Sequence, residues 1–205
     1  MHRLERFLSY LLIMAGAVLL FLGAREIWEW RAGQLAAAQD FANASVEQSY
    51  PSYAPVQPGD AVAKLTIPRL GAQLYVVQGD GKWELRLGPG HIIGTAMPGA
   101  DGNCVIAGHR DTHFRVLKDI RAGDDIVLET RTGQYLYRVK KMGVVSPKNV
   151  SSLQPTADAE LHLITCYPFY YVGAAPKRFV VQAQLVASVA DAAQPAESAE
   201  TAAVP

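Results

Sequence analysis

The amino-acid sequence predicts a mostly β domain, a barrel or a sandwich, preceded by an apolar helix long enough to cross a membrane. Residues 7–24 carry no charge. Between residues 60 and 187, short apolar and β-branched runs alternate with Gly- and Pro-containing stretches, which is typical of short strands joined by tight loops. The chain has 19 basic and 19 acidic residues, and no basic patch is visible, which argues against a nucleic-acid partner.

The first element is the uncharged run of 18 residues at positions 7–24. As an α-helix it would be about 27 Å long, close to the hydrocarbon thickness of a bilayer. Arg3 and Arg6 precede the run and charges of mixed sign follow it, so the positive-inside bias puts the N-terminus in the cytoplasm and the rest outside. The alternatives are a cleaved signal peptide, whose apolar region is usually shorter, and a buried core helix.

Composition then divides the chain into four parts. Residues 1–42 form the cytoplasmic N-terminus, the transmembrane anchor (about 7–24) and a helical stalk. Residues 43–59 contain three prolines and many small polar residues, which indicates a linker. Residues 60–187 form the folded domain, and residues 188–205 are Ala-rich without aromatics, which is typical of a disordered tail.

Seven segments of the domain have the composition of strands. They are residues 61–68, 72–78, 102–109, 124–130, 135–145, 159–166 and 178–187. The sequence RTGQ at residues 131–134 predicts a hairpin turn between the fourth and fifth of these strands. Short helices fit residues 82–87 and 112–120, the second with Asp111 as a helix N-cap.

The two cysteines, Cys104 and Cys166, are too few for a disulfide framework. Residues in a strand alternate between two faces, so Leu161 and Leu163 mark the core face and Cys166 lies on the other. A thiol outside the core, at the end of a strand, has the access that a nucleophile needs. Cys104 shares a face with Ile106 and is predicted to be a small buried hydrophobe.

The same alternation places His109 and Arg178 outside the core, each near the end of a strand. A thiol, an imidazole and a guanidinium at the ends of three strands are the groups that a reactive surface groove would need. His162 shares a face with Cys166, but four residues along a strand span about 13 Å, which is too far for a direct hydrogen bond.

Each candidate also has a structural alternative. Histidines are often structural, and spacing alone does not exclude His91 or His113 as the reactive imidazole. A Cys104–Cys166 disulfide would be compatible with an exported protein, although the two thiols are predicted on opposed faces. A zinc site built from His109, His113 and Cys166 would lack an evident fourth ligand.

Three segments, in this order, resemble motifs of the sortase family. The histidine segment is AGHRDTHFRVLKDI at residues 107–120, the nucleophile motif is LITCYP at residues 163–168, and the arginine strand is RFVVQA at residues 178–183. The resemblance covers roughly residues 60–187. The Gly-His-Arg-Asp-Thr form and the segment from the cysteine to the arginine are most similar to class D sortases and a related group in Gram-negative bacteria.

The resemblance implies a closed eight-stranded β-barrel with short helices and a membrane-anchored cysteine transpeptidase. Such an enzyme cuts a sorting signal of the LPxTG type between Thr and Gly, and passes the acyl group to an amine on a cell-envelope component or another protein. Cys166 would be the nucleophile, His109 the acid/base and Arg178 the transition-state stabiliser. No cofactor or metal is expected, because Asp124 and Asp125 fit turn residues better than a calcium site.

These residue types suit acyl transfer. A thiolate attacks a carbonyl, an imidazole exchanges protons near neutral pH, and an arginine stays charged beside an oxyanion. Thr165 is predicted to face inward and support the site, and the aromatic loop 167–177 is a candidate wall for the apolar part of the signal.

Two alternatives stay open, namely a membrane-tethered cysteine endopeptidase that hydrolyses the same intermediate, and an inactive barrel that binds extended peptides.

Overall fold

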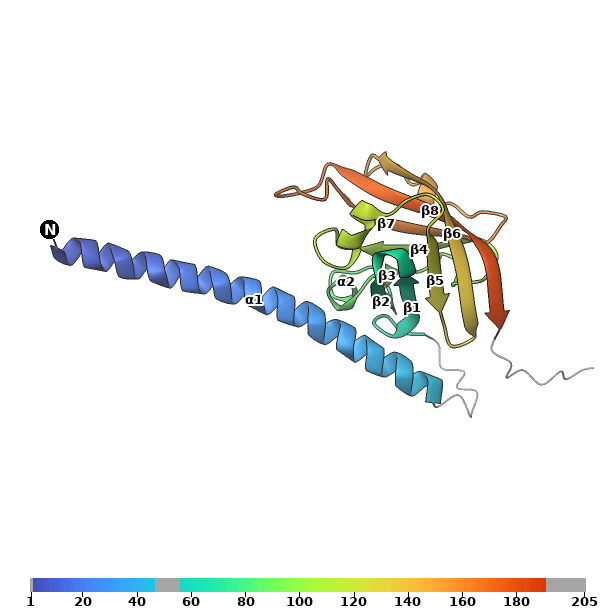
Figure 1. Cartoon of the computed structure of the whole chain (residues 1–205), viewed down its shortest axis with the longest axis horizontal. Helices are drawn as coiled ribbons and strands as arrows, with labels where there is room; N and C mark the ends of the chain where they lie inside the picture. The colour runs from blue at the N-terminus through green and yellow to red at the C-terminus, as the bar shows by residue number, and fades with distance from the viewer. Residues whose placement is uncertain (1, 47–55, 191–205) are drawn as a thin grey trace, which may run out of the picture.

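A computed structural model of the chain describes residues 2–46 and 56–190. A long helix, α1 (His2–Val46), precedes a closed barrel of eight strands (Figure 1). The strands are β1 (Ala61–Ile67), β2 (Ala72–Gln78), β3 (Gly90–His91), β4 (Asn103–Gly108), β5 (Asp125–Glu129), β6 (Gly133–Val145), β7 (Glu160–Tyr167) and β8 (Lys177–Ala190). Short helices are η2 (Pro68–Leu70), α2 (Glu84–Leu87), η3 (His113–Asp119) and η4 (Ser151–Leu153). The predicted eight-stranded barrel with an N-terminal helix is confirmed.

The order of strands around the barrel is β1-β2-β3-β4-β7-β8-β6-β5, and β5 pairs with β1 to close it. The pairs β2–β3 and β4–β7 are parallel, and the others are antiparallel. Since β4 and β7 run parallel, their C-terminal ends meet at one end of the barrel. The antiparallel β8 begins at that same end, so three strand ends converge there.

Alternation along the strands fills the barrel interior with apolar side chains. Leu161 and Leu163 of β7 and Ile106 of β4 are fully buried, and Cys104 is 1% exposed, as the sequence predicted. Burial of a side chain of the Leu or Ile type contributes about 1.5–3 kcal/mol. The interior therefore fixes which residues of β4 and β7 face outward.

The structure differs from the sequence prediction at the margins of the elements. The strand β3 was missed because two residues are too few to show an alternation. The strand β8 ends at Ala190, three residues into the predicted tail, because residues 188–190 pair with the start of β6. The helix η3 begins after Thr112 without a side-chain cap, so the predicted N-cap role of Asp111 is wrong. The helix α1 ends at Val46, so residues 43–46 of the predicted linker are helical. Residues 47–55 of that linker, and the tail after residue 190, lie outside the described residues.

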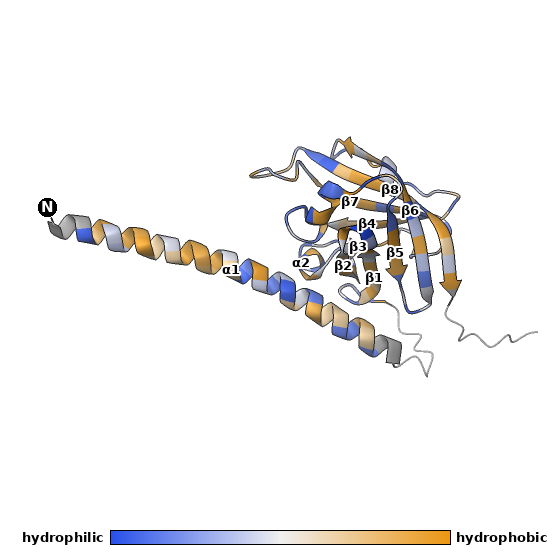
Figure 2. Ribbon diagram, viewed as in Figure 1, coloured by the Kyte–Doolittle hydropathy of each residue, from blue (hydrophilic) through white to orange (hydrophobic). Residues whose placement is uncertain are grey.

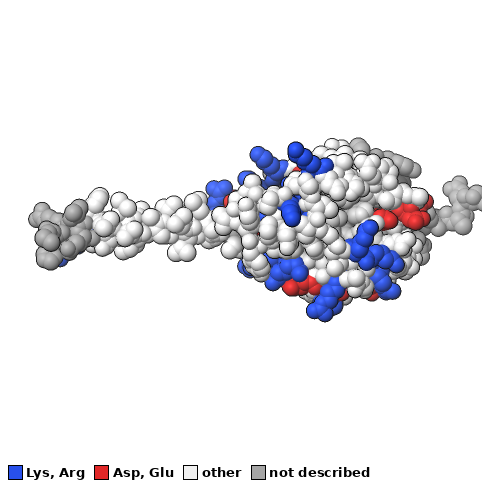
Figure 3. Space-filling model, turned by 90° about the horizontal axis from the view of Figure 1, so that it is seen from above, with Lys and Arg blue, Asp and Glu red and all other residues white. Residues whose placement is uncertain are grey.

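The helix α1 is continuous through the predicted anchor and stalk. Its most apolar window of 18 residues has a mean hydropathy of 2.3, and none of that window is buried. Figure 2 shows the apolar residues gathered in the first half of the helix, and in Figure 3 charged atoms first gather where α1 reaches the barrel. The helix therefore fits a single-pass membrane anchor.

The second half of α1 is fixed to the barrel at an unpaired edge of β2. The side-chain amide of Gln34 accepts a hydrogen bond from Tyr75 N (2.8 Å) and donates to Tyr75 O (3.1 Å) and Leu87 O (2.8 Å). Asp40 accepts a hydrogen bond from Ala61 N (2.9 Å). These polar contacts satisfy backbone groups at a strand edge that water or another chain would otherwise meet.

Apolar contacts complete this docking. Ala37 and Phe41 pack with Ala61 and Val77 in a buried cluster of their own. A Cβ atom added to Gly33 would lie 2.7 Å from the Cα atom of Leu87, so only glycine allows the helix to approach this closely.

A Gly33→Val substitution is therefore expected to separate α1 from the barrel. The Tyr75 amide would lose its Gln34 partner, and its hydrogen exchange should become at least about tenfold faster. Exchange measured by mass spectrometry on the full chain in lipid nanodiscs checks this. Gly23→Val is the matched control, because a Cβ there meets nothing within 4 Å. Unchanged protection of Tyr75 in Gly33→Val would contradict the docking.

Candidate active site

Strand register brings the three predicted reactive residues to one end of the barrel. In the parallel β4–β7 pair, Gly108 lies opposite Thr165, so His109 follows β4 beside the position of Cys166. In the antiparallel β7–β8 pair, Cys166 lies opposite Arg178. The strand β7 thus lies between β4 and β8, with the imidazole of His109 on one side of the Cys166 thiol and the guanidinium of Arg178 on the other.

The two thiols have different surroundings. Cys166 is a free thiol of intermediate exposure at the end of β7. Cys104 is also free, but burial raises its pKa to about 12. A thiol with so high a pKa is protonated near neutral pH and is a poor nucleophile. The structure therefore favours Cys166 as the reactive thiol.

Among the histidines whose side chains the structure describes, His109 alone is exposed. His91, His113 and His162 are 1%, 3% and 6% exposed, and burial lowers the pKa of each. His91 contacts Gln78 Oε1 (2.9 Å) and Ala96 O (2.9 Å) through its two ring nitrogens. Buried imidazoles of this kind are structural, which leaves His109 as the accessible candidate for the acid/base.

The burial of His162 was not predicted. The outer face of β7 at this position is covered by the η4 segment, which Asn103 Nδ2 holds through hydrogen bonds to Ser152 O (2.7 Å) and Gln154 O (3.0 Å). The Nδ1 atom of His162 is hydrogen-bonded to Asn103 Oδ1. His162 therefore belongs to a structural network, although it shares a strand face with Cys166.

The guanidinium of Arg178 keeps free hydrogen-bonding capacity. Its Nη1 atom donates to Lys177 O (3.1 Å) and Ala175 O (3.4 Å). Within residues 2–46 and 56–190 it has no carboxylate partner, so it does not form the surface ion pair that is the usual role of an exposed arginine. An arginine with five donors and two backbone contacts can still bond an anionic oxygen.

Thr165 connects the ends of β4 and β7. Its hydroxyl is buried and donates a hydrogen bond to Gly108 O (2.7 Å). The backbone N–H of Phe114 donates to His109 O (2.9 Å), and a Cβ on Gly108 would lie 2.7 Å from the Phe114 ring. These contacts fix the backbone on which His109 and Cys166 stand.

A Thr165→Val substitution is expected to lower both stability and activity. It keeps the shape of the side chain but removes a buried hydrogen bond, which costs about 1–3 kcal/mol of unfolding free energy. Turnover should fall about tenfold because the two reacting residues lose a common support. Denaturant unfolding and a peptide-ligation assay measure the two effects. Thr66→Val, on a strand that pairs only with β2 and β5, should leave turnover unchanged.

The loop between β7 and β8 is fixed to the segment that follows His109. Arg110 donates to Tyr171 O (2.7 Å) and Gly173 O (3.2 Å), and its guanidinium lies 5.7 Å from the centre of the Tyr171 ring. Lys118 Nζ donates to Tyr170 Oη (3.3 Å). Sequence reasoning missed Arg110, because a charged residue in a loop gives no sign of a contact 61 residues away.

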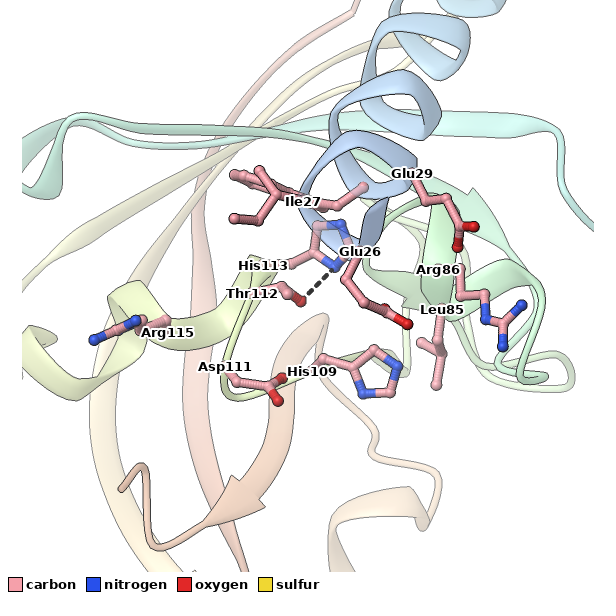
Figure 4. A pocket seen from close by; sticks show the side chains of 11 residues that line it. Glu26, Ile27, Glu29, Leu85, Arg86, His109, Asp111, Thr112, His113 and Arg115 are labelled. Carbon is pink, nitrogen blue, oxygen red and sulfur yellow. Dashed lines mark hydrogen bonds between the residues drawn. The ribbon is translucent and has the colours of Figure 1, made fainter. Parts of the chain in front are cut away.

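Two cavities lie near the end of the barrel that carries His109, Cys166 and Arg178. One, of about 450 Å³, lies between α1 and the segment around His109 and η3 (Figure 4). The other, of about 400 Å³, lies over the outer faces of β6, β7 and β8 and is lined by His162, Met142 and Val180 among others. The first cavity includes residues of α1, which sequence reasoning treated only as anchor and stalk.

A family model described as the sortase domain matches residues 65–186. The chain belongs to the sortase family. Sortase D of Bacillus subtilis is 38% identical over 130 residues, which are 62% of this chain and 65% of that protein. Sortase SrtE1 of Streptomyces coelicolor is 31% identical over 166 residues, 74% of this chain and 47% of that protein. The match thus spans less than two thirds of the length of either relative.

A solved structure, the catalytic domain of SrtD from B. anthracis, is 31% identical, with a TM-score of 0.60, 69% of this chain covered and 98% of that chain. The sortase assignment fits the closed eight-stranded barrel with an apolar N-terminal helix. It also fits the resemblance to class D, since two of these relatives are named sortase D or SrtD.

Proposed function

We propose that this sortase is a membrane-anchored cysteine transpeptidase that cleaves an LPxTG-like sorting signal through a thioacyl intermediate on Cys166 and transfers the acyl group to an amine. The observation that carries the proposal is the register of β4, β7 and β8, in which Cys166 lies opposite Arg178 and beside the position that follows Gly108. An exposed imidazole, a free thiol and an unpaired guanidinium on adjacent strands are the groups that acyl transfer uses.

Each group has one role in this reaction. The Cys166 thiolate attacks the carbonyl carbon of the scissile bond, and Arg178 donates hydrogen bonds to the oxyanion that forms. The imidazolium of His109 gives a proton to the leaving amine, and the thioester remains. The neutral His109 then takes a proton from the incoming amine, whose nitrogen attacks the thioester and expels the thiolate.

The cavity over β6, β7 and β8 supports a binding place for the signal. It includes His162, four residues before Cys166 on the same strand face, which corresponds to about 13 Å. In an extended Leu-Pro-x-Thr signal, the Leu lies three residues before the Thr, about 10 Å away. The cavity also includes Val180, which lies opposite Ile164, two residues before Cys166, so the Leu would lie in the cavity when the Thr lies at the thiol. Met142, Val145 and Val180 supply an apolar lining.

The proposal also assigns the side of the membrane. Arg3 and Arg6 before the apolar run favour a cytoplasmic N-terminus, which puts the barrel on the outer side, where surface proteins with C-terminal sorting signals and envelope amines are found. Attachment of such proteins to the cell surface would be the biological outcome.

One experiment tests the chemistry. The full chain in nanodiscs is incubated with a library of sorting-signal peptides, and intact mass spectrometry and peptide mapping read which peptide is attached to Cys166. Addition of an amine should then yield a ligated product. Turnover that does not depend on the amine, with only hydrolysed peptide, would favour the endopeptidase. Binding without any adduct on Cys166 would favour the inactive peptide-binding barrel.

A further inference from the structure

The cavity between α1 and the His109 segment has two different walls. One wall is the stalk part of α1, with Glu26, Ile27 and Trp30, and the other consists of His109 with the residues that follow it. Figure 4 shows the His109 ring at the border of this cavity, on the side that faces α1. The cavity therefore gives access to the proposed acid/base from the direction of the anchor helix.

Two carboxylates flank the imidazole. In Figure 4 the carboxylate of Glu26, from α1, lies above the His109 ring, and that of Asp111, from the loop after β4, lies to its left. Neither forms an ion pair within the part of the chain that the structure describes, whereas the neighbouring Glu29 is paired with Arg25 (2.7 Å). The lining also includes Arg86 and Arg115, and in Figure 4 their guanidinium groups lie farther from the His109 ring than the two carboxylates do. Beside the ring itself, the two carboxylates favour a cation.

The floor of the cavity holds two buried ring nitrogens without partners. Trp30 Nε1 and His113 Nε2 are buried and have no hydrogen-bond partner among residues 2–46 and 56–190, and the His113 side chain is 3% exposed. The two rings are in edge-to-face contact, with centroids 5.9 Å apart. Thr112 Oγ1 lies 3.4 Å from the other nitrogen of His113. A buried N–H without an acceptor is costly, so a ligand oxygen that reached Trp30 Nε1 would remove that cost.

We infer that this cavity binds the acceptor of the transpeptidation, a primary ammonium with a carbonyl group close to it, such as the amine end of a peptide. Glu26 and Asp111 hold the ammonium and Trp30 Nε1 donates to the carbonyl oxygen. This inference depends on the proposed function, because it assigns a place to the second substrate of that reaction. It also gives α1 a part in substrate binding besides anchoring.

The bound ammonium is placed for the second half of the reaction. His109, which has already given its proton to the first leaving amine, is neutral and takes one proton from the ammonium. The amine nitrogen then forms a C–N bond to the thioester carbonyl carbon, the C–S bond breaks, and Cys166 leaves as a thiolate. After loss of the second proton of the ammonium nitrogen to solvent, the product is a neutral amide and the charges balance.

The test compares a charged acceptor with an uncharged one. The full chain in nanodiscs ligates an LPxTG-type peptide to glycinamide, an ammonium with an adjacent carbonyl, or to hydroxylamine, which is mostly uncharged at neutral pH. In Glu26→Gln and Asp111→Asn, the KM for glycinamide should rise about tenfold, as expected for loss of a charged hydrogen bond, while the KM for hydroxylamine changes less than about twofold. Trp30→Phe should raise the KM for glycinamide as well.

Asp101→Asn removes the same charge from an exposed loop position outside the cavity and should leave both KM values unchanged. An unchanged KM for glycinamide in Glu26→Gln and Asp111→Asn would overturn the inference. An equal rise for both nucleophiles would also overturn it, because the carboxylates would then act through His109 and not on the ammonium. If intact mass spectrometry finds no thioacyl enzyme in the unsubstituted protein, it is the proposed function that fails, and the inference fails with it.

Discussion

A Cys166→Ala variant is expected to form no covalent adduct with a sorting-signal peptide and to lose ligation by more than about 10⁴-fold. The reason is that no second thiol can replace it. Cys104 is 1% exposed on the inner face of β4, and burial raises its pKa to about 12. Intact mass spectrometry after incubation with peptide, together with quantified ligation product, measures both effects.

Cys104→Ser is the matched control for this prediction. It removes the other cysteine and should keep the adduct and the ligation activity, at the expense of some stability, because a hydroxyl enters the apolar core. Iodoacetamide should modify Cys166 and spare Cys104 in the native protein. An adduct on the Cys166→Ala variant would show that the nucleophile had been assigned to the wrong residue.

His109→Ala is expected to reduce turnover by about 10²–10⁴-fold. The other histidines whose side chains the structure describes, His91, His113 and His162, are buried, so the variant keeps no accessible imidazole that could protonate the leaving amine and then deprotonate the acceptor. Peptide binding should change far less than turnover, because His109 exchanges protons and does not hold the signal. Single-turnover ligation and an equilibrium binding assay on the same protein separate the two.

His162→Ala is the control for the choice of imidazole. His162 lies on the same face of β7 as Cys166, but it is buried and hydrogen-bonded to Asn103. Its removal should lower stability by about 1–3 kcal/mol, because Asn103 loses a buried partner, and reduce turnover by less than about tenfold. Equal losses of turnover in the His109 and His162 variants would mean that the assigned acid/base is wrong.

The face on which a side chain lies could be predicted from the sequence wherever the alternation within a single strand decides it. The alternation of Leu161 and Leu163 against Cys166 gives the face of the thiol, because the two leucines are buried wherever β7 lies in the barrel. The adjacency of β4 and β7 could not be read in this way. It is a parallel contact between segments about 57 residues apart, and no local pattern in either strand specifies its partner.

Contacts made by the segments that pack on the outside of the barrel, η4 and α1, could also not be predicted from the sequence. His162 lies on the outer face of β7 and is nevertheless buried, because Asn103 holds the η4 segment over it through hydrogen bonds to Ser152 O and Gln154 O. Gln34 and Glu26 of α1 read as polar positions of a stalk. The barrel residues that Gln34 bonds, and those that line a cavity together with Glu26, are many residues away in the sequence. Helical periodicity reports which residues share a face, and it does not report what that face meets.

The unbroken α1 has a mechanical consequence. Ten residues separate Ala24 from the docking residue Gln34, a rise of about 15 Å, and the helix has no interruption between them. Transmembrane helices tilt to match the local bilayer, on average by about 20°. With α1 as the proposed membrane anchor, a thicker or thinner bilayer would change the tilt of the helix and rotate the barrel with it. The height of the candidate active site above the lipid would then change as well.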